Sequence, residues 1–171
     1  MAFDIEREKL QGDTFEDALK IVCGFFQIDN LYEEQKTILR PFFLGKTVFF
    51  SAGTGYGKSL IFQAVPLLAD LLIDQAIRTS IAIVICPLIS LMRDQVSYLK
   101  SVGFSAAAVF EGQDEQVLKD IENGLYSLVY LSPESMLSVQ RWRKMLQSTH
   151  FETHCIVVAV DEAHCISQWY V

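Results

Sequence analysis

A glycine-rich segment at residues 52–59 most strongly constrains how this chain of 171 residues can fold. It reads Ala-Gly-Thr-Gly-Tyr-Gly-Lys-Ser, follows an apolar, β-rich run at 47–51 and precedes a stretch with helical spacing at 58–73. Glycines let the backbone curl so that successive N–H groups point inward, and the start of a helix adds a partial positive charge. A strand, a glycine-rich turn and a helix in this order predict a phosphate-binding loop.

The residue types in this loop predict which side chain contacts the phosphates and which contacts the metal ion. The Lys58 ammonium supplies a point charge for the terminal phosphates, and the Ser59 hydroxyl is available to Mg²⁺. The alternative is a glycine-rich turn with an incidental lysine, but the strand before it and the helix after it favour the phosphate loop. The predicted nucleotide-binding residues here are Thr54, Gly55, Tyr56, Gly57, Lys58, Ser59 and Leu60.

Short apolar runs alternate with helical stretches along the rest of the chain. Besides 47–51, strands are expected at 80–86, 105–110, 127–131 and 155–161. Helices are expected at 14–26, 31–44, 58–73, 91–103 and 115–124. Strands that are apolar on both faces and linked by helices predict an α/β fold. We expect a doubly wound, mostly parallel sheet with helices on both faces and ligands at the carboxyl ends of its strands.

The last predicted strand ends at a pair of carboxylates, Asp161 and Glu162, followed by Ala163 and His164. A carboxylate at the carboxyl edge of a sheet that also carries a phosphate loop suits a magnesium ligand, which predicts this role for Asp161. An adjacent glutamate can orient or deprotonate the attacking water. Taken alone, such a pair is an ordinary solvated turn, so the prediction depends on the phosphate loop.

Composition limits the class of protein. Apolar residues make up 51% of the chain, enough for one packed core, and the longest apolar run, 80–92, is shorter than the roughly 18 residues that a membrane helix needs. The formal charge is −7, but residues 1–35 hold nine acids and three bases, whereas the remainder is nearly neutral. Charge therefore neither predicts nor excludes DNA binding.

Cysteine spacing and the N-terminal segment predict an intracellular protein. The four cysteines are far apart and form no Cys-x-x-Cys pair, which favours reduced thiols over a disulfide framework or a zinc site. The opening residues are charged and lack the apolar stretch of a secretory signal. No membrane association is expected.

Longer motifs carry a resemblance to a known family. Residues 161–169 read Asp-Glu-Ala-His-Cys-Ile-Ser-Gln-Trp, residues 86–96 read Cys-Pro-Leu-Ile-Ser-Leu-Met-Arg-Asp-Gln-Val, and residues 130–134 read Tyr-Leu-Ser-Pro-Glu. Together with the phosphate loop, these segments resemble the first RecA-like domain of superfamily 2 helicases, specifically the RecQ family. The resemblance runs from about Phe26 to Trp169.

The resemblance implies a RecA-like P-loop NTPase domain at 27–171, preceded by an acidic helical segment at 1–26. It implies an ATP-dependent DNA helicase that uses ATP and Mg²⁺ and acts on single-stranded or forked DNA in the nucleus of a eukaryote, or otherwise in the cytoplasm. Gln35 would read adenine; an exposed helical glutamine is the alternative. The implied catalytic residues are Lys58, Glu162 and His164, with Ser59 and Asp161 at the metal. The implied nucleic-acid contacts are Ser90, Gln95, Ser132, Gln168 and Trp169.

Some residues depart from the family pattern. Gln27, Leu31 and Tyr32 stand where the family usually has Gly, Phe and Arg, and Gly53 and Tyr56 replace proline and glycine in the loop. Ser90 and Ser132 also suit helix capping, which is compatible with DNA contact. After Trp169 the chain has only Tyr170 and Val171, so we expect that the second RecA-like domain is missing and that hydrolysis is nearly absent.

Two further classes stay open at this point. One is a short nucleotide-binding interaction module without turnover of its own. The other is a P-loop kinase or transporter ATPase, which the segments at 86–96 and 161–169 disfavour together.

Overall fold

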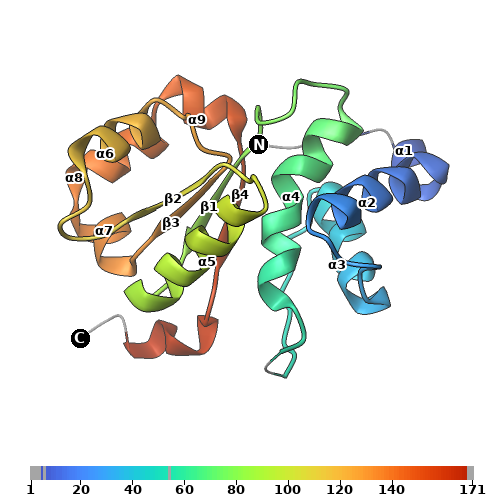
Figure 1. Cartoon of the computed structure of the whole chain (residues 1–171), viewed down its shortest axis with the longest axis horizontal. Coiled ribbons are helices and arrows are strands. Elements are labelled where there is room, and N and C mark those ends of the chain that lie inside the picture. Colours follow the sequence, from blue (N-terminus) through green and yellow to red (C-terminus); the bar gives the residue numbers. More distant parts are fainter. Residues whose placement is uncertain (1–4, 6, 54, 169–171) are drawn as a thin grey trace. The chain divides into compact units, whose positions relative to one another are not determined.

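The computed structural model describes residues 5, 7–53 and 55–168, which form two compact units. The first unit extends to Thr79 and is helical, and the second starts at Ser80 and contains a sheet (Figure 1). Among the described residues, no helix has both the length and the apolar character needed to cross a bilayer.

The first unit packs its helices around an apolar centre. Its helices are α1 (Arg7–Gln11), α2 (Asp13–Phe25), α3 (Glu33–Phe43) and α4 (Lys58–Leu72). Helix α2 contacts α1 and α4, and α3 also contacts α4. Helix α2 is amphipathic because its buried residues recur at helical spacing. They are Phe15, Ala18, Leu19, Val22 and Cys23. The helices expected at 14–26, 31–44 and 58–73 are thus confirmed.

The strand expected at 47–51 is absent. This segment has no regular secondary structure, and the Phe49 side chain is 83% exposed. An apolar β-rich run becomes a strand only when a neighbouring strand satisfies its backbone N–H and C=O groups. No ladder among the described residues includes 47–51. The prediction was wrong because it used side-chain composition and took no account of a pairing partner.

The second unit is built on a four-stranded parallel sheet. Its strands are β1 (Ile81–Ile85), β2 (Ala106–Val109), β3 (Leu128–Leu131) and β4 (Cys155–Val160), in the spatial order β2-β3-β1-β4. All three pairings are parallel. The sheet therefore confirms the α/β class and the four other predicted strands.

Helices cover both faces of this sheet. They are α5 (Ile89–Ser101), α6 (Glu115–Glu122), α7 (Pro133–Ser138), α8 (Gln140–Leu146) and α9 (Thr149–His154). One face packs Ile83, Val129 and Leu131 against Ile121 of α6 and Trp142 of α8. Helix α5 contacts β2 and lies on the other side of the sheet (Figure 1). This is the doubly wound arrangement that the alternating pattern predicts.

The connection from β3 to β4 contains the three short helices α7, α8 and α9, none of which was predicted individually. After β4 the chain turns at Asp161 and Glu162 and enters a 3-10 helix, η1 (Ala163–Gln168). Glu162 has a φ of 51°, a left-handed conformation that is uncommon for a residue with a side chain. The turn therefore redirects the chain sharply after the strand.

Candidate nucleotide-binding site

The phosphate loop ends in a left-handed turn at the start of α4. Gly55 and Gly57 have φ values of 81° and 68°, which glycine adopts without steric cost. Gly57 is the N-cap of α4, and the helix begins at Lys58. The Lys58 Nζ donates to the carbonyl oxygens of Ala52 and Gly53, both at 3.0 Å. The lysine thus closes the loop on itself and holds its charge at the N-terminus of the helix.

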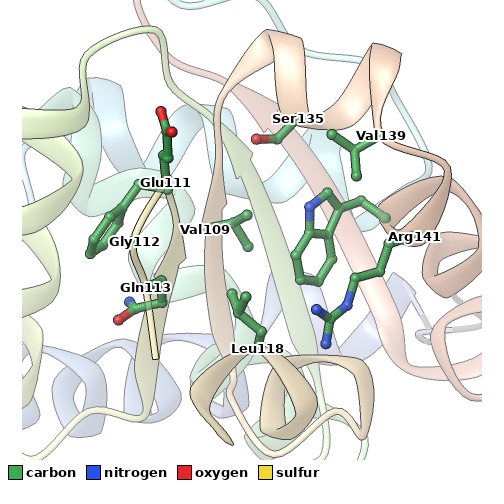
Figure 2. Close-up of a pocket in the computed structure, with 10 residues that line it drawn as sticks. Val109, Glu111, Gly112, Gln113, Leu118, Ser135, Val139 and Arg141 are labelled. Atoms are coloured by element: carbon green, nitrogen blue, oxygen red, sulfur yellow. The ribbon is translucent and has the colours of Figure 1, made fainter. Parts of the chain in front are cut away.

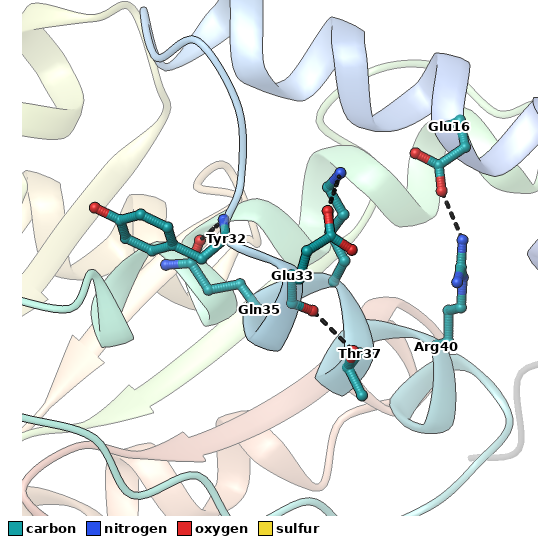
Figure 3. Close-up of polar contacts among 7 residues, drawn as sticks. Glu16, Tyr32, Glu33, Gln35, Thr37 and Arg40 are labelled. Carbon is teal, nitrogen blue, oxygen red and sulfur yellow. Dashed lines mark hydrogen bonds and ion pairs between the residues drawn. The ribbon is translucent and has the colours of Figure 1, made fainter.

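Gln35 holds the loop from α3. Its side chain is buried, and Nε2 donates to the carbonyl oxygens of Tyr56 at 3.2 Å and Gly57 at 3.0 Å. Its Oε1 accepts from the Tyr32 backbone N–H at 2.9 Å, which completes a capping box at the start of α3 (Figure 3). The exposed-glutamine alternative is therefore wrong, and Gln35 positions the backbone of the phosphate loop.

Tyr56 of this loop lies against Tyr32, the residue that precedes α3. The rings of Tyr32 and Tyr56 are 5.0 Å apart between centroids. The Glu34 carboxylate accepts hydrogen bonds from its own backbone N–H and from the Tyr56 hydroxyl, and both bonds lower the pKa of this carboxyl. Tyr56 in turn has a raised pKa, chiefly because of its hydrogen bond to Glu34. Tyr32 and Tyr56 are two of the departures from the family pattern, but their mutual contact had no signal in the sequence.

A charge pair ties α3, which carries Gln35, to α2. Arg40 Nη2 lies 2.6 Å from Glu16 Oε1, and the Arg40 guanidinium lies 4.9 Å from the centre of the Phe15 ring (Figure 3). Both charged side chains are partly exposed, so their pairing contributes modestly to stability. The pair is a direct contact between α3 and α2.

In the second unit, three residues of the sequence motifs follow adjacent strands at the carboxyl end of the sheet. Ile85 of β1 pairs in register with Leu131 of β3 and Val160 of β4. The next residues along the chain are Cys86, Ser132 and Asp161. The parallel register therefore brings these three positions together, as predicted for the ligand-binding edge.

Asp161 is held at the end of β4 by its neighbours. Its backbone N–H donates to the Ile85 carbonyl at 2.9 Å, and its Oδ1 accepts from the Glu162 N–H at 2.9 Å. Its side chain is almost fully buried. Glu162 Oε2 lies 3.2 Å from Nδ1 of the exposed His164. Burial raises the pKa of the Cys86 thiol, and the charges of Asp161 and Glu162 raise it further.

Three of the predicted nucleic-acid contacts, Ser90, Gln95 and Ser132, are capping or at least partly exposed residues. Ser132 is the N-cap of α7, and its Oγ accepts from the Ser135 N–H at 3.1 Å. Ser90 is exposed in the first turn of α5, whose N-cap is Leu88, so Ser90 does not cap this helix. Gln95 is partly exposed on the same helix. Gln168 ends η1, whereas Thr54 and Trp169 lie outside the described residues.

The donor atoms fit the chemistry of magnesium. Ser59 lies in the first turn of α4 in the first unit, and Asp161 ends β4 in the second. A hydroxyl and a carboxylate are the hard oxygen donors that Mg²⁺ uses alongside phosphate oxygens and water.

Comparison with known proteins identifies the family of the chain. The profile of the DEAD/DEAH box helicase family matches residues 32–171. The chain is 36% identical over 157 residues to the ATP-dependent helicase wrn-1 of Caenorhabditis elegans, covering 90% of this chain and 14% of that protein. It is 33% identical over 158 residues to the ATP-dependent DNA helicase RecQ of Pasteurella multocida, covering 89% and 22%.

A third relative, the ATP-dependent DNA helicase Q1 of Pongo abelii, is 32% identical over 155 residues, covering 87% of this chain and 22% of that protein. The chain thus spans between 14% and 22% of the length of these relatives. The resemblance to RecQ helicases is confirmed. The chain belongs to the DEAD/DEAH box helicase family, with RecQ helicases among its relatives.

Proposed function

We propose that this chain is the ATP-binding motor domain of a RecQ-like DNA helicase and that it binds Mg-ATP and single-stranded DNA. The observation that carries the proposal is the closed phosphate loop, in which Lys58 bonds the carbonyls of Ala52 and Gly53 while Gln35 bonds those of Tyr56 and Gly57. An ammonium has three donors, so the two loop bonds leave capacity for a phosphate oxygen.

Each proposed residue has a distinct task. Lys58 and the backbone N–H groups at the start of α4 bind phosphate oxygens. Ser59 and Asp161 supply oxygen ligands for Mg²⁺, which when bound neutralises phosphate charge. Glu162 accepts a proton from the attacking water, and His164 is placed to orient the Glu162 carboxylate through their 3.2 Å contact.

Single-stranded DNA is proposed to cross the sheet edge where Ser132 follows β3. Serine hydroxyls and helix N-termini bind phosphates without reading sequence, as a motor that moves along DNA requires. Ser90 and Gln95 on α5, with Gln168 and Trp169 after Asp161, complete the proposed contacts. A forked duplex and a second RecA-like domain are the proposed partners of the working enzyme.

Slow turnover is proposed for these 171 residues on their own. Phosphoryl transfer needs charge stabilisation on more than one side of the γ-phosphate, and Lys58 with Mg²⁺ supplies one side. An arginine supplied by another domain is typically worth about 10³ to 10⁵ in rate. The nucleotide would therefore bind without being turned over efficiently.

DNA binding can be tested by fluorescence anisotropy of labelled oligothymidylate, with and without a non-hydrolysable Mg-ATP analogue. We expect binding that weakens as NaCl rises, because phosphate contacts release counterions. A duplex of the same length is the control for strand preference. Absence of binding at low salt, in the presence and absence of nucleotide, would contradict the proposed DNA contact.

A further inference from the structure

A pocket of about 360 Å³ lies at the carboxyl end of β2, within the second unit. It is enclosed by the last residue of β2, the turn that follows it, and helices α6, α7 and α8 (Figure 2). None of the residues assigned above to nucleotide or DNA lines it. The volume is within the range of small binding pockets and can hold one or two side chains, but it is too small for a whole helix.

The pocket has an apolar lining that remains partly open. Val109 and Trp142 are nearly fully buried, whereas Val139 at the junction of α7 and α8 is 40% exposed. Val109, Leu118 and Val139 lie around the space in Figure 2. A depression lined mainly by apolar side chains with a few polar groups beside it is the usual form of a site that binds an apolar group.

Charged contacts hold one wall of the pocket in place. Arg141 Nη2 lies 3.0 Å from Glu115 and 2.7 Å from Glu122, both on α6. Its guanidinium also lies 5.0 Å from the centre of the Trp142 ring. These contacts connect α8 to α6 on either side of the space, so the wall is ordered before a ligand arrives, which lowers the entropy cost of binding.

The charged groups at the pocket are mainly acidic. The charged residues that line it are Glu111, which is exposed, and Arg141. Arg141 is already paired with two carboxylates, those of Glu115 and Glu122. The charged lining residues and their ion-pair partners are thus three acids and one base, so the rim attracts cations and disfavours the phosphate backbone of DNA.

We propose that this pocket docks a protein segment in which an aliphatic or aromatic side chain is flanked by lysine or arginine. The apolar side chain enters between Val109, Leu118 and Val139, and the flanking cations face the acidic rim. Hydrophobic anchors in ordered pockets supply most of the affinity at small interfaces, while charge complementarity at the rim sets specificity. The pocket is thus a partner-binding site separate from the motor functions.

The test uses ¹⁹F NMR of the 171-residue chain labelled with 5-fluorotryptophan. The sequence has two tryptophans, so Trp142 gives one of two signals, assigned with Trp169→Phe. The probe is an acetylated and amidated Lys-Leu-Lys-Leu-Lys peptide. We expect a saturable shift of the Trp142 signal, with at least about tenfold weaker binding of Lys-Ser-Lys-Ser-Lys and Glu-Leu-Glu-Leu-Glu peptides.

Val139→Asn places a polar amide at the apolar mouth without adding charge and should weaken binding of the Lys-Leu peptide at least about tenfold. Val139 is the N-cap of α8, a position at which Asn is favoured, so the variant is expected to stay folded. Leu125→Asn is the matched control, because Leu125 is an exposed leucine that precedes β3, at the amino ends of the strands, whereas the pocket lies at a carboxyl end. It should bind like wild type.

Three results would overturn the proposal. The Lys-Leu peptide could bind no more tightly than the Lys-Ser peptide, which would show that only charge attracts the peptide and that no apolar side chain enters the pocket. Val139→Asn could bind the Lys-Leu peptide as tightly as Leu125→Asn does, while both variants unfold at the same urea concentration. Oligothymidylate could shift the Trp142 signal and compete with the peptide, which would assign the pocket to a nucleobase.

Discussion

The Gln35 side-chain nitrogen lies 3.0 Å from the Gly57 carbonyl oxygen, and this bond joins α3 to the last turn before α4. A residue 22 positions earlier in the chain therefore sets the shape of the phosphate loop. Because Oε1 of the same amide accepts from Tyr32, both ends of the Gln35 side chain are engaged. Reading adenine, which remains a prediction for Gln35, would require part of this network to rearrange.

Gln35→Ala should weaken Mg-ATP binding by up to about 30-fold, because two hydrogen bonds of roughly 1 kcal/mol each would no longer hold the loop. The substitution should also remove any preference for ATP over GTP. Calorimetric titration of the variant with each nucleotide measures both effects. Thr37→Ala, on the same helix, removes only a local bond to the Glu33 carbonyl and should bind like wild type. Unchanged affinity of Gln35→Ala for both nucleotides would contradict this role.

Gly57→Ala should impair nucleotide binding more severely than Gly53→Ala. A Cβ on Gly57 would lie 2.7 Å from Gln35 Nε2, and its φ of +68° costs other residues about 1–2 kcal/mol. A Cβ on Gly53 would meet nothing within 4 Å. Calorimetric titration of both variants with Mg-ATP checks this prediction. Equal affinities of the two variants for Mg-ATP would show that the backbone conformation at Gly57 does not matter for binding.

Ser132→Asp separates helix capping from DNA contact. Aspartate caps as well as serine, so the urea midpoint should change little. The added charge should weaken binding of single-stranded DNA several-fold at low salt. Ser148→Asp is the matched control, because Ser148 caps α9 through the Phe151 N–H and is not a proposed DNA contact. A similar loss of DNA affinity in both variants would assign the effect to net charge alone.

Stability should fall between pH 9 and pH 11 because of Cys155. Burial raises the pKa of this thiol from 9.0 to about 11, so the folded state keeps a proton that the unfolded chain loses. The stabilising contribution is present below pH 9 and is lost as pH rises through 11, an effect of about 2–3 kcal/mol. Urea unfolding at pH 8 and pH 10.5 should show a smaller loss in Cys155→Ala than in wild type or Cys165→Ala. An equal loss in all three proteins would refute the assignment.

Periodicity predicted most of the fold because the relevant interactions are repetitive. Strands β1, β2 and β3 are buried runs, and α2 places apolar residues at helical intervals, so local pattern and burial agree there. Strand β4 is equally apolar, but its residues are half-buried or exposed. The helices α7 to α9 are only six or seven residues long and have too few turns for a period to emerge. The segment 47–51 has the composition of a strand but lacks a partner, which no local pattern reveals.

The sequence predicted which residues belong to the candidate site, but it did not predict the contacts among them. Lys58, Asp161 and Glu162 were recognisable because phosphate and magnesium chemistry demands these types at those places. The burial of Gln35 and the Tyr32–Tyr56 contact depend on how α3 packs against the loop. Such contacts between distant parts of the chain have no period in the sequence.

The central claim is that the loop before α4 binds the phosphates of ATP through Lys58. Titration calorimetry of Mg-ATP into wild type, Lys58→Ala and Lys20→Ala tests it most directly. Lys20 is an exposed lysine of the same unit that pairs with Asp17. We expect wild type and Lys20→Ala to bind ATP with equal affinity and Lys58→Ala to show no measurable binding at millimolar nucleotide. Equal binding by all three proteins would contradict the assigned site.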